Sequence, residues 1–208
     1  MPRLDKKHKN KLIRLIGMRL VEMKLDENEI GFGVDAVSLV ESPAIESNFI
    51  ALKKADLERL NFATVNEEKR LVMGSLLIPD KPILRIDEDG EPYNIFFTKE
   101  TIRRASQLFL MNGYQNSATL EHAVKLQGVT VVESWIVENP KKDKVALYGI
   151  DAKKGSWAIA MKVEYHRLKQ RILNGQFNGF SIEGKFEGIQ QLSELDKIKA
   201  LLKSNGYE

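Results

Sequence analysis

The chain has 208 residues, of which 43% are hydrophobic and 29% charged, a composition typical of a folded domain and not of a disordered chain. Its apolar runs fall far short of the roughly 20 residues that a membrane-spanning helix needs, and the absence of cysteine excludes disulfides and cysteine-based nucleophiles or metal sites. The 32 basic and 29 acidic residues leave a net charge of only +3, whereas a dedicated nucleic-acid-binding protein usually has a clear basic excess. We therefore expect a soluble, cytoplasmic protein.

Two helices and a strand are expected in the first third of the chain. Apolar residues recur every three or four positions over 12–23, which predicts a helical arm within residues 1–28. A strand is expected over 34–40, and Pro43 ends it because proline has no amide hydrogen to donate to a neighbouring strand. Residues 53–69 are mixed and charged, and we interpret them as a short helix and a connection.

Signals from residue 71 onward are mostly those of strands. Asp89-Gly90 favours a tight hairpin because these residue types adopt positive backbone angles readily. Thr98 and Gly113 mark the start and the end of a helix. The other elements that we expect are strands over 71–78, 83–87, 93–97, 118–120, 129–137, 145–150, 156–163 and 179–186, a short helix over 165–173 and a tail helix from Ser193.

Six to eight strands with a few interspersed helices predict an α+β domain whose sheet is largely antiparallel and could close into a barrel. Along the chain we expect a helical arm over 1–28, the main domain over 29–188 and a helical tail over 189–208.

The three histidines of the chain are His8, His122 and His166. His8 lies in a basic N-terminal segment and His166 at the start of a predicted helix, so both are expected at the surface. His122 follows a short predicted strand, and strand ends can hold a side chain rigidly while it meets solvent and substrate. His122 is therefore the candidate general base, although its position alone also fits an ordinary polar residue.

Ser181 is the candidate nucleophile. It stands in the predicted strand over 179–186, where alternation turns Ser181, Glu183 and Lys185 to one side and the apolar residues to the other. A serine hydroxyl is a weak nucleophile until a neighbouring base takes its proton, so this role requires the fold to bring His122 to it. A purely structural serine in a glycine-flanked strand is the alternative.

Glu133 is the third candidate. It alternates in phase with Val131 and Trp135, and a buried carboxylate is costly without a partner. Orienting the imidazole of the base is one such partnership, and pairing with a lysine or reaching solvent is the other. Glu133 falls in an apolar phase and Ser181 in a polar one, a conflict that a β-bulge or the curvature of a barrel would remove.

Other chemistries lack their motifs. The chain contains no glycine-rich phosphate loop and no His-Glu-x-x-His sequence. The nucleophile motif Gly-x-Ser-x-Gly is also absent, because Glu183 stands in place of its second glycine. Three scattered histidines without cysteine do not suit zinc, so no metal or cofactor is expected.

Seven short motifs run in order over about residues 34–187. They are Val37-Ser-Leu-Val-Glu-Ser-Pro-Ala-Ile45, Gly74-Ser-Leu-Leu-Ile-Pro-Asp80, Phe97-Thr-Lys-Glu-Thr-Ile102, Thr119-Leu-Glu-His122, Val132-Glu-Ser-Trp-Ile-Val137, Gly155-Ser-Trp157 and Gly179-Phe-Ser-Ile-Glu-Gly184. Together they resemble the phage prohead (procapsid maturation) proteases, and in particular the XkdF-like group of phage serine proteases.

The resemblance implies a fold like that of herpesvirus assemblin, a mainly antiparallel β-barrel surrounded by helices. By motif it makes Ser181 the nucleophile and His122 the general base of a protease domain. Assemblins use a second histidine after the serine, but this sequence has none beyond His166, and we expect Glu133 in its place. Lys185 is the nearest counterpart of the arginine that helps to hold the oxyanion.

The implied function is that of a serine endopeptidase that cuts scaffold, the amino-terminal part of the capsid protein and then itself. It would act inside the assembling procapsid, in the host cytoplasm. The resemblance implies scaffold protein, major capsid protein and portal as partners, and a homo-oligomer, without a membrane, a cofactor or direct nucleic-acid binding. Two alternatives stay open: a catalytically inactive procapsid core or assembly protein with the same fold, and a nucleic-acid-binding virion protein, which the small net charge disfavours.

Overall fold

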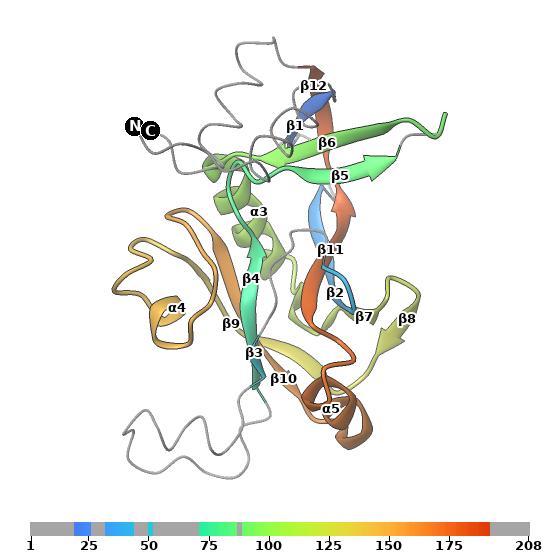
Figure 1. The fold of residues 1–208 in the computed structure, drawn as a ribbon, viewed down its shortest axis with the longest axis vertical. Coiled ribbons are helices and arrows are strands. Elements are labelled where there is room, and N and C mark those ends of the chain that lie inside the picture. Colours follow the sequence, from blue (N-terminus) through green and yellow to red (C-terminus); the bar gives the residue numbers. More distant parts are fainter. Residues whose placement is uncertain (1–18, 26–31, 44–49, 52–70, 87–88, 192–208) are drawn as a thin grey trace, which may run out of the picture.

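The computed structural model describes residues 19–25, 32–43, 50–51, 71–86 and 89–191. These residues form three four-stranded sheets and a few helices (Figure 1). The first sheet has the strand order β12 (Glu187–Gln191), β1 (Leu20–Lys24), β6 (Pro92–Phe97), β5 (Ile83–Ile86). The second has the order β3 (Ile50–Ala51), β4 (Leu71–Leu77), β10 (Trp157–Val163), β9 (Val129–Ile136). The third has the order β11 (Gly179–Lys185), β2 (Gly33–Val40), β7 (Ala118–Leu120), β8 (Val124–Leu126).

The predicted fold class is wrong, because these sheets do not close into a helix-surrounded, assemblin-like barrel. A closed barrel has no sheet edges, whereas each sheet of the described part has two end strands, such as β11 and β8. The described helices are α3 (Lys99–Met111), the short α4 (Lys144–Leu147), α5 (His166–Leu173) and the 3-10 turn η1 (Tyr114–Asn116). None of them is long and apolar enough to cross a membrane. Alternation along a strand reveals which face is buried but not which strand closes the sheet, so the pattern could not exclude separate sheets.

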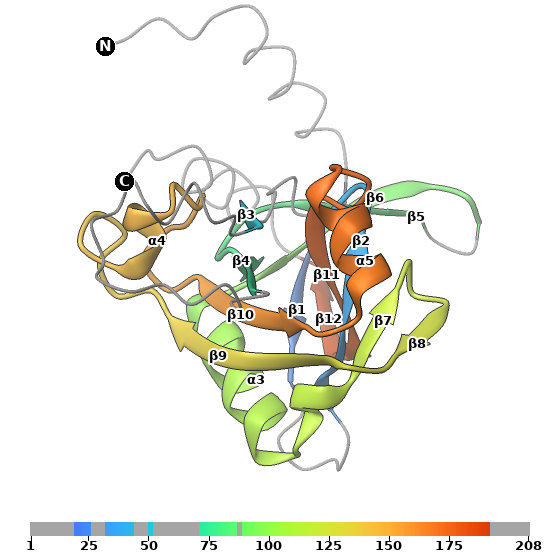
Figure 2. The ribbon, with the colours of Figure 1, turned by 90° about the horizontal axis from the view of Figure 1, so that it is seen from below.

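Helix α3 packs its buried face on the second and third sheets, where it contacts β2, β9 and β10 (Figure 2). Phe109 on α3 and Trp157 on β10 are both fully buried, with an edge-to-face ring contact at 5.5 Å between centroids. The helix begins as the sequence predicts, because Thr98 Oγ1 accepts the Thr101 backbone N–H at 3.3 Å. Phe180, next to the candidate nucleophile, is also buried in this core. The strand that carries Ser181 is thus fixed from its inner face.

Most of the predicted elements are confirmed. They include the strands β2, β4, β5, β6, β7, β9, β10 and β11 and the helices α3 and α5. The predicted helices over 53–69 and from Ser193 onward lie outside the described residues, as does most of the N-terminal arm.

Two predicted elements are wrong. Leu20–Lys24 is a strand and not part of a helix, because it pairs in parallel with β6 and antiparallel with β12. Within the strand predicted over 145–150, residues up to Leu147 belong to α4, whose first turn is capped by Asp143. Asp143 Oδ1 accepts the Val145 N–H at 3.2 Å and the Trp135 Nε1–H at 2.9 Å. The first correction rests on strand partners distant in sequence, which local periodicity does not report, whereas the second rests on the cap that Asp143 provides.

Candidate functional site: a serine, an imidazole and a carboxylate on one sheet

Three hydroxyl groups lie side by side across the third sheet. Ser181 on β11 is the antiparallel partner of Ser38 on β2, and Ser38 is the parallel partner of Thr119 on β7. Partners in adjacent strands present their side chains on the same face. Glu183 lies two residues after Ser181, so its side chain shares that face. The sequence prediction that Ser181 and Glu183 point to the same side therefore agrees with the contacts described below.

His122 follows β7 in a turn with an unusual backbone. Glu121 and His122 have φ angles of 49° and 57°, in the left-handed region that costs a residue with a side chain about 1–3 kcal/mol. Two backbone hydrogen bonds hold the turn, from Glu121 N–H to Leu39 O and from Ala123 N–H to Leu120 O, each at 3.0 Å. A third bond runs from the His122 N–H to Ser38 Oγ, also at 3.0 Å. The histidine is thus fixed to β2 through its backbone, while its ring is 43% exposed.

The carboxylate in contact with the imidazole is that of Glu183. His122 Nδ1 and Glu183 Oε1 lie 3.3 Å apart, and the Glu183 side chain is 30% exposed. Thr119 Oγ1 donates a hydrogen bond to the same carboxylate oxygen. An acid at Nδ1 fixes the tautomer of a histidine and leaves Nε2 available for proton transfer. The arrangement has the chemistry required to orient a general base.

Ser181 is 8% exposed, and its hydroxyl has no hydrogen-bond partner among the residues that the structure describes. No hydrogen bond joins it to the His122 ring in this structure, although both residues are tied to Ser38. Ser181 is the cross-strand partner of Ser38, and His122 donates its backbone N–H to the Ser38 hydroxyl. Contacts between a nucleophile and its base are often loose before substrate binds. The fold therefore brings the two predicted residues to one region of one sheet and leaves the hydroxyl free.

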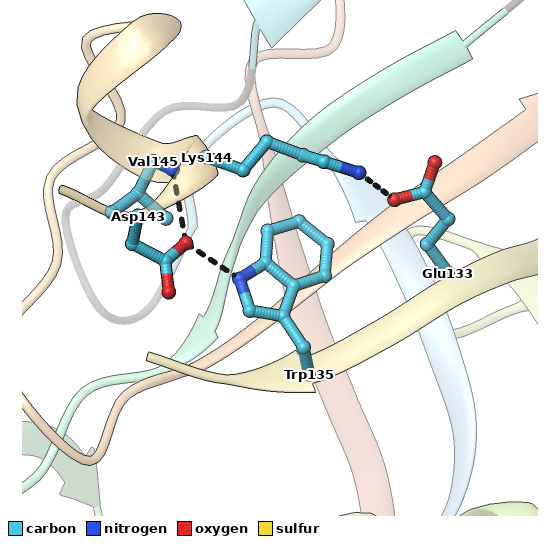
Figure 3. Close-up of polar contacts among 5 residues, drawn as sticks. All are labelled: Glu133, Trp135, Asp143, Lys144 and Val145. Atoms are coloured by element: carbon cyan, nitrogen blue, oxygen red, sulfur yellow. Dashed lines mark hydrogen bonds and ion pairs between the residues drawn. The ribbon is translucent and has the colours of Figure 1, made fainter. Parts of the chain in front are cut away.

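Glu133 lies elsewhere, on the second sheet. Its carboxylate forms an ion pair with Lys144 Nζ, and Trp135 beside it binds Asp143 (Figure 3). In Figures 1 and 2, α4, which begins at Lys144, and the β7–β8 hairpin lie on opposite sides of the molecule. The lysine partnership, left open by the sequence, is the one present here. The structure does not bring Glu133 to His122.

A β-bulge explains why the alternation around Glu133 misleads. Val131 pairs with Met161, but Glu133 pairs with the adjacent residue Ala160, so that Val132 is the extra residue. Adjacent residues of β10 point to opposite faces. Val131 consequently faces the main core, whereas Glu133 faces the side of α4. A bulge was one of two features that would have reconciled the alternation of Glu133 with that of Ser181, and the bulge present here turns Glu133 to the face opposite to that of Val131.

Lys185, the expected counterpart of an oxyanion-holding arginine, is four residues beyond Ser181, or about 13 Å along an extended strand. It lines a cavity of about 460 Å³ with Arg85, Ile182 and Phe186. The predicted close approach of another backbone at Gly184 is confirmed, since a Cβ there would lie 2.0 Å from Gly33 O. Lys185 is thus placed at the far end of β11 from the serine.

Sequence reasoning missed Glu183, Ser38 and Thr119 as members of this region. The signal for Glu183 was present, because alternation put it on the face of Ser181. Nothing in the sequence pointed to Ser38 or Thr119, whose relevance depends on the pairing of β2 with β11 and β7. His166 is the first residue of α5, and His8 lies outside the described residues. Within the described part, no group of three potential metal ligands occurs.

A second serine, Ser75, lies near the basic side chain of Lys153 but differs from Ser181 in its surroundings. Burial lowers the pKa of the Lys153 ammonium, and the nearby carboxylate of Asp80 opposes that shift; a lowered pKa is a property of lysines that act as bases. Ser75 lies near this segment, but it is 1% exposed and its hydroxyl donates to Asp151 O. That hydroxyl is engaged and inaccessible, unlike that of Ser181.

A nucleophilic hydroxyl, an imidazole and a carboxylate that contacts the imidazole are the groups of a serine hydrolase. The model of the family described as "Putative phage serine protease XkdF" matches residues 59–190. The chain belongs to this family of phage serine proteases, and the match includes Ser181, His122 and Glu183. No curated protein and no solved structure matches the chain.

Proposed function

We propose that the chain is a serine endopeptidase with Ser181 as nucleophile, His122 as general base and Glu183 as the acid that orients the imidazole. The observation that carries this assignment is the 3.3 Å contact between His122 Nδ1 and Glu183 Oε1, on the face of the sheet that also bears Ser181. Glu183 replaces Glu133 in this role, because the carboxylate of Glu133 is paired with Lys144.

The reaction is acyl transfer. Ser181 Oγ attacks the carbonyl carbon of the scissile peptide while His122 Nε2 takes the hydroxyl proton. The imidazolium, stabilised by the carboxylate of Glu183, then gives this proton to the leaving amine, and the peptide C–N bond breaks. Water, deprotonated in turn by His122, attacks the ester, releases the acid product and restores the serine.

The substrates that we propose are the scaffold protein, the amino-terminal part of the capsid protein and the protease itself. Membership of a phage serine protease family supports the coarser statement that the chain acts as a phage protease. The site of action would be the interior of the procapsid in the host cytoplasm, with scaffold, major capsid protein and portal as partners of a homo-oligomer. The ordered motifs that resemble prohead proteases support this proposal.

Covalent labelling with a fluorophosphonate probe tests the nucleophile without knowledge of the cleavage sequence. We expect the probe to modify Ser181, as mapped by mass spectrometry of peptides, and S181A to abolish labelling. Ser106→Ala is the control, because Ser106 is similarly buried at 6% exposure and lies on α3. Modification of another serine, or equal labelling of S181A, would refute the assignment.

Co-expression with scaffold and capsid proteins tests the biological role. The wild-type chain is expected to shorten scaffold, whereas S181A and H122A are expected to leave it intact. If both variants process scaffold as the wild type does, the protein is not the enzyme responsible. That result would favour the alternative that the chain is an inactive procapsid core protein with this fold.

A further inference from the structure

We infer that Ser38 is a positioning residue for the general base, an inference that rests on the proposed function. Ser38 is fully buried in β2, the strand between β11 and β7. Its hydroxyl oxygen accepts the backbone N–H of His122 at 3.0 Å. Ser181, on the neighbouring strand, is its direct partner. Ser38 thus pairs with the proposed nucleophile through its strand and holds the proposed base through its side chain.

The conformation of His122 explains why such an anchor is needed. Its φ of 57° is in the left-handed region, which residues other than glycine adopt uncommonly, although asparagine, aspartate and histidine do so more often than the rest. Such a residue keeps this geometry only when its surroundings impose it. Among the hydrogen bonds that hold the turn, the bond to Ser38 is the one made by the His122 backbone itself.

The direction of the imidazole depends on this backbone. The Cα–Cβ bond leaves the backbone in a direction set by φ and ψ, so a turn that relaxed toward negative φ would move Nδ1 away from Glu183. Glu183 lies on β11, and the pairing of β11 with β2 fixes its position. Loss of the Ser38 acceptor would therefore loosen the contact between imidazole and carboxylate without touching either group. Misplacement of a catalytic group by about 1 Å can cost roughly 100-fold in rate.

If Ser38 had only a structural role, its hydroxyl would affect the stability of the fold and not the reaction rate. Two variants separate these possibilities. Ser38→Thr and Ser38→Val add the same bulk to a strand position, where both residue types are favourable, but only threonine keeps an oxygen that can accept the His122 N–H. The matched control is Ser156, which is also fully buried and accepts a backbone N–H, that of Lys153, at 2.9 Å.

The experiment compares the second-order rate constant of Ser181 labelling by a fluorophosphonate at a temperature where every variant is folded. We expect S38V to react roughly 10- to 100-fold more slowly than S38T. S156V and S156T are expected to label at equal rates, although S156V will melt at a lower temperature. Equal labelling rates for S38V and S38T would overturn the inference.

NMR of the histidine rings gives a second readout that does not depend on activity. The chain has three histidines, so the ring signals of His122 can be assigned by their loss in H122Q. We expect these signals to shift between S38T and S38V and to coincide between S156T and S156V. If the wild-type chain is not labelled at all, the proposed function fails, and the ring signals then decide the role of Ser38. Coincident His122 signals in S38T and S38V would contradict it.

Discussion

Glu133 and Glu183 are two partly exposed carboxylates on strands, and their surroundings give them different uses. Glu133, on β9, is paired with the ammonium of Lys144 beside the ring of Trp135. Glu183, on β11, meets the ring of His122 and the hydroxyl of Thr119. A lysine pair at the surface neutralises an acid and does little else, because such pairs contribute only about 0–1 kcal/mol. An imidazole pair changes the chemistry of the imidazole. The partner, and not the degree of burial, distinguishes the two acids.

The strongest test of this difference exchanges each carboxylate for an amide. Glu183→Gln keeps the shape but loses the charge that orients and stabilises the imidazolium, so we expect labelling of Ser181 to slow by about 10²- to 10⁴-fold. Glu133→Gln is the matched control and should leave the rate within about twofold of the wild type, because its carboxylate contacts Lys144 and not the imidazole. If E133Q were the slower variant, the assignment of the acid would have to return to Glu133.

A second test concerns the backbone that places Glu183. Gly184 follows it directly, and a Cβ at this position would lie 2.0 Å from Gly33 O of β2. Gly184→Ala must therefore push β11 away from β2, at a cost of about 3 kcal/mol or more. For a domain of this size such a loss lowers the melting temperature by roughly 10 °C, which calorimetry would measure.

Gly149→Ala is the control for that substitution. Gly149 has a φ of 63° and no atom within 4 Å of an added Cβ, so alanine there suffers only the left-handed strain of about 1–2 kcal/mol. Equal melting temperatures for G184A and G149A would show that separating the two strands costs no more than the left-handed strain at Gly149. The position of Glu183 would then not depend on their close approach.

A smaller effect is expected at Thr119, whose hydroxyl donates to Glu183. Thr119→Val removes this donor at constant shape, and the loss of a hydrogen bond to a charged group of about 1.5 kcal/mol corresponds to roughly tenfold slower labelling. Thr130→Val is the control, because Thr130 Oγ1 donates to Asn116 Oδ1 at 2.7 Å, away from His122. A T119V variant as fast as T130V would mean that Glu183 needs no support from β7.

The contrast between the two acids also shows what the sequence could and could not predict. Strands such as β2 and β10 were predictable because alternation and apolar runs are local. The bulge at Val132 was not, since it depends on the pairing of β9 with β10. The contact between Glu183 and His122 requires β2 to bring β11 and β7 into register. The left-handed turn at His122 carries no glycine, and one of the hydrogen bonds that hold it comes from an acceptor on Ser38, far away in the sequence.

The smallest predicted effect concerns Glu133, the acid that is paired with Lys144. Lys144→Met removes the cation that pairs with Glu133, but both side chains are about 40% exposed, so water and salt already weaken the pair. We expect a fall in melting temperature of at most about 3 °C, and this difference from the wild type should shrink further in 1 M salt. The labelling rate should not change, since no bond links Lys144 to the third sheet in the described part of the chain. A large, salt-independent loss of labelling in K144M would mean that the Glu133 pair supports the reaction, and the separation of the two regions would then be wrong.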